Sequence, residues 1–165
     1  MLRSGASADT GFSVCVSPRD HRLQQAAVCA SPLLDTNICI YIAKQKPPGV
    51  LARLQQLKAG DVGISVVTHL ELSYGAWKSQ QREANLQRIQ ALERLIPVLP
   101  LDIGMGKHYG EVRAALERKG TPIGAYDLLI AAHALSLGLI LVTNNLREFR
   151  RVPKLIVENW AEEVG

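Results

Sequence analysis

The chain has 165 residues, of which 47% are hydrophobic and 21% charged, and this is enough apolar material for one domain built around a core. Its 19 Lys and Arg against 15 Asp and Glu give a formal net charge of +4, which favours an anionic partner without naming one. No uncharged apolar run approaches the roughly 18 residues that a membrane span needs. The 3 cysteines form no C-x-x-C pair, so they support neither a disulfide framework nor a thiolate zinc site, and a reducing cytoplasm is the expected compartment.

Residues 1–30 differ in composition from the rest of the chain. They are rich in Ser, Ala and Gly, show no sustained hydrophobic period, and carry charges where a signal peptide would need an apolar stretch. We expect a poorly structured N-terminal extension followed by one folded domain over 31–165. A mis-called start is one hypothesis for this extension, with translation beginning at a non-Met codon near Val28, because the next methionine is Met105.

Beyond residue 30, short apolar runs alternate with longer amphipathic segments, as they do in βαβ units. In chain order, the pattern predicts a strand ending at 33–34, a helix at 50–58, a strand at 61–66, a helix opening at Thr68, a helix at 84–95, a strand at 98–99, helices at 106–119 and 125–137, a strand at 139–142 and an edge strand at 155–157. The fold class is therefore α/β, with a central parallel β-sheet flanked by α-helices.

Three acidic residues stand in apolar surroundings: Asp35, Glu71 and Asp127. Asp35 follows the first strand, at the sheet edge where ligands bind in open α/β proteins, although it could equally cap the turn that follows. Glu71 lies three residues after Thr68, so a capping box with Thr68 is its structural alternative. Asp127 opens an almost wholly apolar helix, where stabilisation by the helix N-terminus would also explain a carboxylate.

Taken together, these acids indicate a metal site. Carboxylates that meet at one sheet edge repel one another, and a hard divalent ion such as Mg²⁺ or Mn²⁺ would relieve that repulsion. Such an ion takes further oxygen ligands from water and from a substrate phosphate, so hydrolysis of a phosphodiester bond is the natural chemistry.

Four segments of the sequence resemble the PIN-domain ribonucleases and, within them, the VapC-type toxins of bacterial toxin–antitoxin modules. They are Leu33 to Asn37, Ser65 to Ala76, Gly124 to Ala134, and Leu141 to Phe149, in the family's order and at its usual separations. The resemblance implies a PIN fold and metal-dependent endonucleolytic cleavage of RNA, with tRNA a reasonable substrate. It also implies a cognate antitoxin that neutralises the chain, and a homodimer.

The resemblance assigns Asp35, Glu71 and Asp127 as metal ligands. The family often has a fourth acid after the late strand, where this chain has Asn144 and Asn145, with Glu148 one turn further on. Asn145 matches the acidic position best and is expected as a fourth catalytic residue, whose amide oxygen could hold a metal-bound water. A mechanism with one metal ion is then as plausible as one with two.

Two other functions stay open on the residues alone. The asparagines motivate a nuclease-impaired PIN module that binds RNA or protein, although the three retained acids argue against it. A phosphatase of the haloacid-dehalogenase type also begins with an Asp at the end of a strand, but it needs a second Asp where this chain has Asn37.

Other polar residues have simpler interpretations. The histidines at 69, 108 and 133 lack metal-ligand spacing and are expected to be structural or on the surface. Gly104 to Lys107 lacks the full P-loop spacing and is expected to be a loop that enters a helix. Among the basic residues, Arg147, Arg150 and Arg151 follow the predicted active edge and are the best candidates for phosphate contacts.

Overall fold

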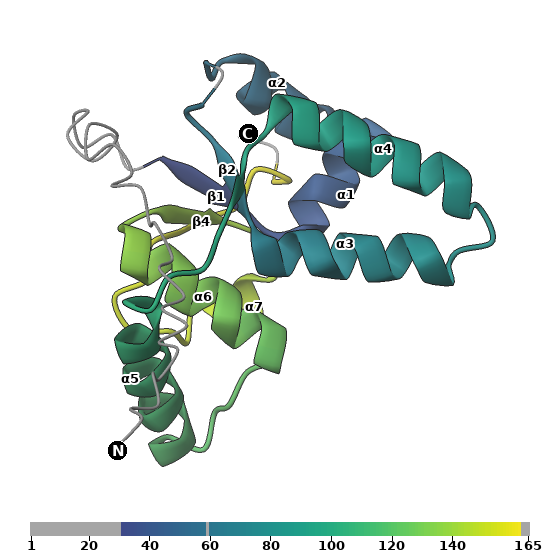
Figure 1. Cartoon of the computed structure of the whole chain (residues 1–165). Helices are drawn as coiled ribbons and strands as arrows, with labels where there is room; N and C mark the ends of the chain where they lie inside the picture. The colour runs from purple at the N-terminus through teal and green to yellow at the C-terminus, as the bar shows by residue number, and fades with distance from the viewer. Residues whose placement is uncertain (1–30, 59, 163–165) are drawn as a thin grey trace, which may run out of the picture.

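The computed structural model describes residues 31–58 and 60–162 (Figure 1). Within them, a 5-stranded parallel sheet has the order β3-β2-β1-β4-β5. The strands are β1 (Pro32–Leu34), β2 (Gly63–Ser65), β3 (Val98–Leu99), β4 (Ile140–Val142) and β5 (Val157–Glu158). The helices are α1 (Thr36–Lys44), α2 (Pro48–Gln55), α3 (Val66–Lys78), α4 (Arg82–Leu95), α5 (Met105–Arg118), α6 (Ala125–Leu137) and α7 (Leu146–Phe149). The predicted parallel α/β architecture is confirmed, and the predictions about residues 1–30 lie outside the described residues.

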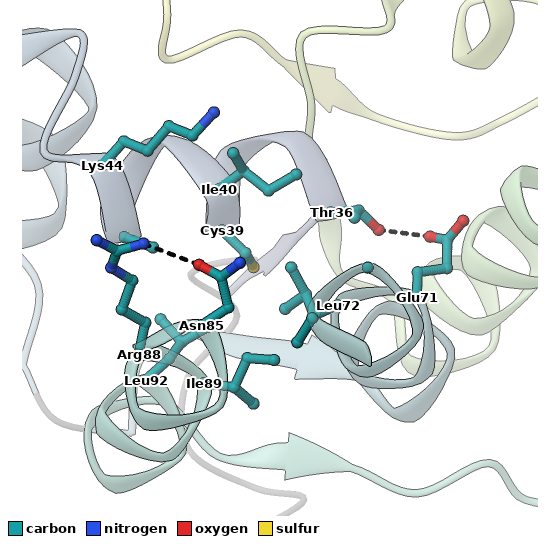
Figure 2. Close-up of a pocket in the computed structure, with 13 residues that line it drawn as sticks. Thr36, Cys39, Ile40, Lys44, Glu71, Leu72, Asn85, Arg88, Ile89 and Leu92 are labelled. Carbon is teal, nitrogen blue, oxygen red and sulfur yellow. Dashed lines mark hydrogen bonds between the residues drawn. The ribbon is translucent and has the colours of Figure 1, made fainter. Parts of the chain in front are cut away.

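One face of the sheet packs against α1, α2 and α4. Side chains alternate across a strand, so Leu34, Ile64 and Val142 all belong to this side. The core here is completed by Ile38, Cys39, Val50, Val62, Leu92, Ile96 and Trp160. A pocket of about 250 Å³ opens between α1, α3 and α4 on this side (Figure 2).

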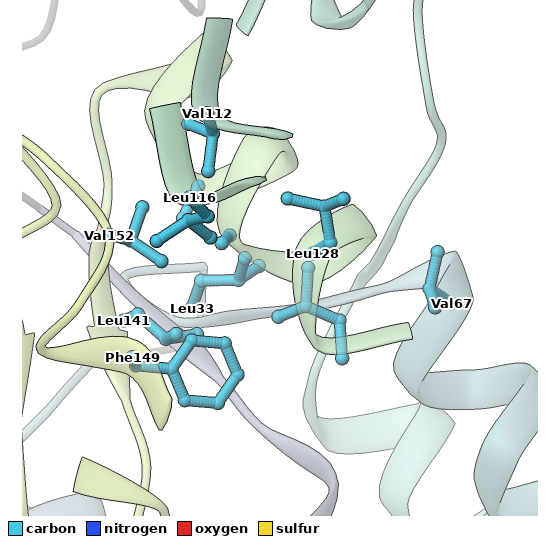
Figure 3. Close-up of a cluster of buried hydrophobic side chains, with 11 residues drawn as sticks. Leu33, Val67, Val112, Leu116, Leu128, Leu141, Phe149 and Val152 are labelled. Atoms are coloured by element: carbon cyan, nitrogen blue, oxygen red, sulfur yellow. The ribbon is translucent and has the colours of Figure 1, made fainter. Parts of the chain in front are cut away.

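The opposite face packs against α5, α6 and α7 (Figure 3). Leu33 and Leu141 contribute to it from adjacent strands, in register with each other. The rest of this core comes from Val67, Val112, Leu116, Leu128, Ile130, Ala131, Ala134, Phe149 and Val152. Helix α6 is buried along most of its length, which explains why its sequence is apolar on every side.

Strand β1 is the topological switch point of the sheet. It is paired with β2 on one side and with β4 on the other, and each of these strands runs parallel to it. Chain connections leave the carboxyl ends of β1 and β4 toward opposite faces, which opens a crevice where ligands bind in folds of this class. Asp35 follows β1 and Thr143 follows β4, so both stand at this crevice.

Several predicted boundaries shift for identifiable reasons. Helix α2 begins at Pro48 rather than at Val50, because proline is compatible with the first turn of a helix. The second strand ends at Ser65, and the helix expected to open at Thr68 begins at Val66. Helices α1 and α7 were not predicted from the sequence, whereas the prediction of helix 125–137 is confirmed to the residue.

In the described part of the chain, no helix combines the length and the apolar character needed to cross a lipid bilayer.

Candidate functional site

Asp35 is the buried centre of the site, with only 3% of its surface exposed. Its Oδ1 accepts a hydrogen bond of 2.7 Å from the backbone N–H of Thr36, so the expected capping role is real. Its Oδ2 accepts a hydrogen bond of 2.6 Å from the hydroxyl of Thr143. Burial raises the pKa of Asp35 above its ordinary value, the two hydrogen bonds oppose that rise, and repulsion from Glu71 adds to it.

Glu71 lies inside α3 and points back to the start of α1. Its carboxylate accepts a hydrogen bond from the hydroxyl of Thr36, which ties it to the residue beside Asp35 (Figure 2). The structural alternative for Glu71, a capping box with Thr68, is wrong, because Ser65 is the N-cap and its Oγ accepts from the N–H of Val67. Glu71 is therefore free of any capping role and is available to the site.

Asp127 reaches the site from the first turn of α6 and is partly buried. Its Oδ2 accepts a hydrogen bond of 3.2 Å from the side-chain amide of Asn145. Burial, followed by repulsion from Asp35, Glu71 and Glu148, raises the pKa of Asp127 to about 6. The like charges of these three carboxylates therefore add to the effect of burial in disfavouring ionisation of Asp127.

Thr143 is a site residue that the sequence analysis missed. It is fully buried directly after β4, donates to Asp35, and accepts a hydrogen bond of 2.9 Å from the backbone N–H of Asn145. The available signal was a hydroxyl residue at the carboxyl end of a buried strand, immediately before two asparagines. Its contacts complete a continuous hydrogen-bonded path through the site, and the members in order are Glu71, Thr36, Asp35, Thr143, Asn145 and Asp127.

Two other polar residues that follow β4, Asn144 and Glu148, have different surroundings. Asn144 turns away from the carboxylates, because its amide donates to the hydroxyl of Tyr41 at 3.0 Å. Glu148 makes the smallest contribution to the raised pKa of Asp127, by repulsion of like charge, and it forms a 3.3 Å ion pair with Arg151.

The three arginines proposed for phosphate contacts differ in their surroundings. Arg147 and Arg150 are exposed, whereas Arg151 is partly buried and engaged with Glu148. The first two are therefore the better placed to meet a polyanion.

The predicted structural roles of two histidines agree with their contacts. His133 is buried in α6, with Nδ1 2.9 Å from the hydroxyl of Ser65, and burial lowers its pKa, which favours the neutral ring. His69 contacts the carboxylate of Glu93 and so connects α3 with α4.

The chemistry of the donors suits a hard divalent cation. Asp35, Glu71 and Asp127 supply only carboxylate oxygens, and their mutual repulsion favours a positive charge between them. As the side chains of residues 31–58 and 60–162 stand, no three His, Cys, Asp or Glu groups are arranged to hold one ion together. Mg²⁺ does not require three, because it commonly binds one or two carboxylates and fills its shell with water and substrate phosphate.

Comparison with known proteins gives one consistent family. Residues 33–155 match the PIN domain. The chain is 50% identical over 129 residues to the "tRNA(fMet)-specific endonuclease VapC" of Shigella flexneri, a match that covers 78% of this chain and 97% of that protein. The protein of the same name from Salmonella typhimurium is 46% identical over 128 residues, covering 78% of this chain and 96% of the relative.

Solved structures agree with the sequence comparison. VapBC2 from Rickettsia felis, bound to a DNA fragment from its promoter, matches with a TM-score of 0.74 at 39% identity, over 78% of this chain and 98% of that chain. DNA-bound VapBC from Salmonella typhimurium matches with a TM-score of 0.74 at 45% identity, over 79% of this chain and 98% of that chain.

The Thr143 hydroxyl should matter more to stability than its methyl group. Thr143→Val keeps the shape of the side chain but leaves Asp35 Oδ2 and the N–H of Asn145 without this partner, so the free energy of unfolding should fall by about 1–3 kcal/mol. Thr143→Ser keeps the hydroxyl and should cost about 1 kcal/mol or less for the lost methyl group. Urea unfolding of both variants measures the difference, and equal losses would show that the hydroxyl contributes nothing.

The raised pKa of Asp127 predicts a pH dependence of stability in metal-free protein. Between its ordinary value of 3.8 and its value of about 6 in the fold, the native state holds this proton more tightly than the unfolded chain does. The free energy of unfolding should therefore decrease as pH rises through that window, and Asp127→Asn should reduce the slope. Urea unfolding with EDTA at a series of pH values tests this, and identical slopes for the two proteins would contradict it.

Proposed function

The chain belongs to the PIN-domain family, among its VapC ribonucleases, and from that premise we propose that it is a metal-dependent endoribonuclease toxin neutralised by a cognate antitoxin. The observation that carries the proposal is the set of interacting carboxylates of Asp35, Glu71 and Asp127 at the switch point of the sheet. RNA in the cytoplasm is the expected substrate, and small structured RNA such as tRNA is the class suggested by the names of the relatives.

Each residue of the site has a definable task in phosphodiester hydrolysis. We propose that Asp35, Glu71 and Asp127 hold Mg²⁺ or Mn²⁺ between them, with one or two of these carboxylates as direct ligands and the rest acting through bound water. When bound, such an ion supplies a water of lowered pKa and offsets charge on the phosphate. Thr36 restrains Glu71 through its hydroxyl and Asp35 through its backbone N–H, so the ligands are oriented before substrate arrives.

The exposed arginines would attract the phosphate backbone of RNA. Arg147 and Arg150 lie in and just after α7, immediately beyond the loop that carries Asn145. Their guanidinium groups can pair with phosphates without reading base sequence, so they would contribute affinity that weakens as salt concentration rises.

Cleavage of total cellular RNA by the purified chain tests the proposed activity. Discrete fragments are expected with Mg²⁺ or Mn²⁺ and not with EDTA, and Asp35→Asn or Asp127→Asn should lower the rate about 100-fold or more because each removes a ligand charge. Asp61→Asn, which changes an exposed carboxylate outside the site, is the matched control and should cleave normally. No fragments from folded, antitoxin-free protein with either ion would favour a nuclease-impaired module that binds RNA or protein.

The pocket between α1, α3 and α4 is a candidate binding site for an inhibitor beside the carboxylate of Glu71. Thr36 and Glu71 line one end, and apolar side chains that include Leu72, Ile89 and Leu92 line the wall. The polar side chains Lys44, Asn85 and Arg88 line the other end (Figure 2). We propose that the antitoxin places apolar side chains in this pocket and a cationic group toward Glu71.

Substitution in the pocket wall tests the proposed antitoxin contact. Ile89→Glu puts a charge into the apolar wall and should weaken binding of the cognate antitoxin about 10-fold or more. Ile103→Glu is the control, because Ile103 is fully exposed and lies outside the pocket. Calorimetric titration of each variant with antitoxin gives the affinities, and unchanged binding by Ile89→Glu would remove this pocket from the interface.

Helix α3 carries an exposed apolar surface that a second copy of the chain could bind. Leu70, Tyr74 and Trp77 are each more than half exposed, and their spacing places them along one side of the helix. Exposed apolar side chains that follow one helix face are typical of a contact surface. We propose that this stripe contributes to a homodimer, which sedimentation equilibrium would detect as a doubled mass.

A further inference from the structure

The side chain of Asn145 is committed to one carboxylate of the site. Its Nδ2 lies 3.2 Å from Oδ2 of Asp127, and its backbone N–H is held by the hydroxyl of Thr143. Asn145 is also the N-cap residue of α7, yet its side chain makes no capping hydrogen bond. The amide therefore reaches across to α6 instead of serving the helix that it begins.

The chemistry of the two groups fixes which end of the amide faces Asp127. An ionised carboxylate only accepts hydrogen bonds, and the NH₂ group is the only donor on the Asn side chain. The end that faces Asp127 is thus the nitrogen, whose lone pair is delocalised into the amide, so the atom held against Asp127 is a hydrogen-bond donor and a poor ligand for a metal ion.

We propose that Asn145 is a positioning residue that orients the Asp127 carboxylate for the metal, and that it does not act as a fourth ligand. The inference rests on the proposed function for the presence of the metal. It assigns to the asparagine a task that an acidic residue in the same place could not perform, because a second carboxylate has no hydrogen to donate.

The charges around Asn145 support an amide at this position. Asp35, Glu71 and Glu148 already act on Asp127 with like charge. An aspartate in place of Asn145 would add another negative charge beside them and would leave Asp127 Oδ2 without its donor. A neutral donor limits the repulsion while it restricts rotation of the Asp127 side chain.

Three variants distinguish a positioning residue from a ligand: Asn145→Ala, Asn145→Asp, and Asn144→Ala as the neighbouring control, whose amide contacts Tyr41. At saturating Mn²⁺ we expect kcat for RNA cleavage to fall about 10-fold for both substitutions of Asn145, as is common when a partner of a metal ligand is lost, with little change in KM. Asn144→Ala should match the unsubstituted chain. An Asn145→Asp variant that cleaves at least as fast as the unsubstituted chain, or an unimpaired Asn145→Ala, would overturn the proposal.

A second measurement needs neither metal nor activity. Thermal unfolding of metal-free Asn145→Ala, Asp127→Ala and the double variant forms a double-mutant cycle for this contact. We expect non-additive shifts in Tm, since removing either partner breaks the same hydrogen bond, while Asn144→Ala combined with Asp127→Ala should be additive. Additive shifts for the Asn145 pair would refute the contact. If the unsubstituted chain cleaved no RNA with any ion, the proposed function would fail while this cycle still decided the contact.

Discussion

The structure depends on keeping a carboxylate buried at the centre of its sheet. Asp35 lies where β1 and β4 end side by side, and both of its oxygens accept hydrogen bonds, one from the start of α1 and one from Thr143. Without those donors an ionised group at this depth would be strongly destabilising, because burial already raises its pKa. The same donors fix its direction, so the requirement for burial and the requirement for a defined ligand geometry are met by the same contacts.

The two hydrophobic cores hold the other acids at that edge. Glu71 belongs to α3, which contributes Val67 to the core on one face and packs Leu72 against the core on the other. Asp127 belongs to α6, whose buried residues anchor it against the sheet. The carboxylates stay close to one another because the apolar packing of their helices leaves them little freedom to separate. A bound cation would offset the resulting electrostatic repulsion.

Much of this arrangement was predictable from sequence, and the exceptions have physical causes. The pattern of buried strands and amphipathic helices predicted the parallel sheet, and acidic residues in apolar surroundings identified Asp35, Glu71 and Asp127 as candidates. The N-cap of α3 was misplaced because Ser65 and Thr68 are both good capping residues, and only the end of β2 decides between them. Helix α7 was not predicted because 4 residues are too few to show a helical period. Thr143 was not predicted because its role depends on a hydrogen bond to Asp35, a residue 108 positions away.

The long separation between Asp35 and Thr143 in the sequence determines when the site can form during translation. The hydrogen bond between Asp35 and Thr143, and the pairing of β1 with β4, join one segment to another that is translated about a hundred residues later. A nascent chain that has emerged only as far as α5 possesses Asp35 and Glu71 but has neither the strand nor the hydroxyl that complete their setting. Activity toward RNA would therefore arise only after β4 and Thr143 have left the ribosome, so the ribosome that makes the toxin is spared its action until that point of elongation.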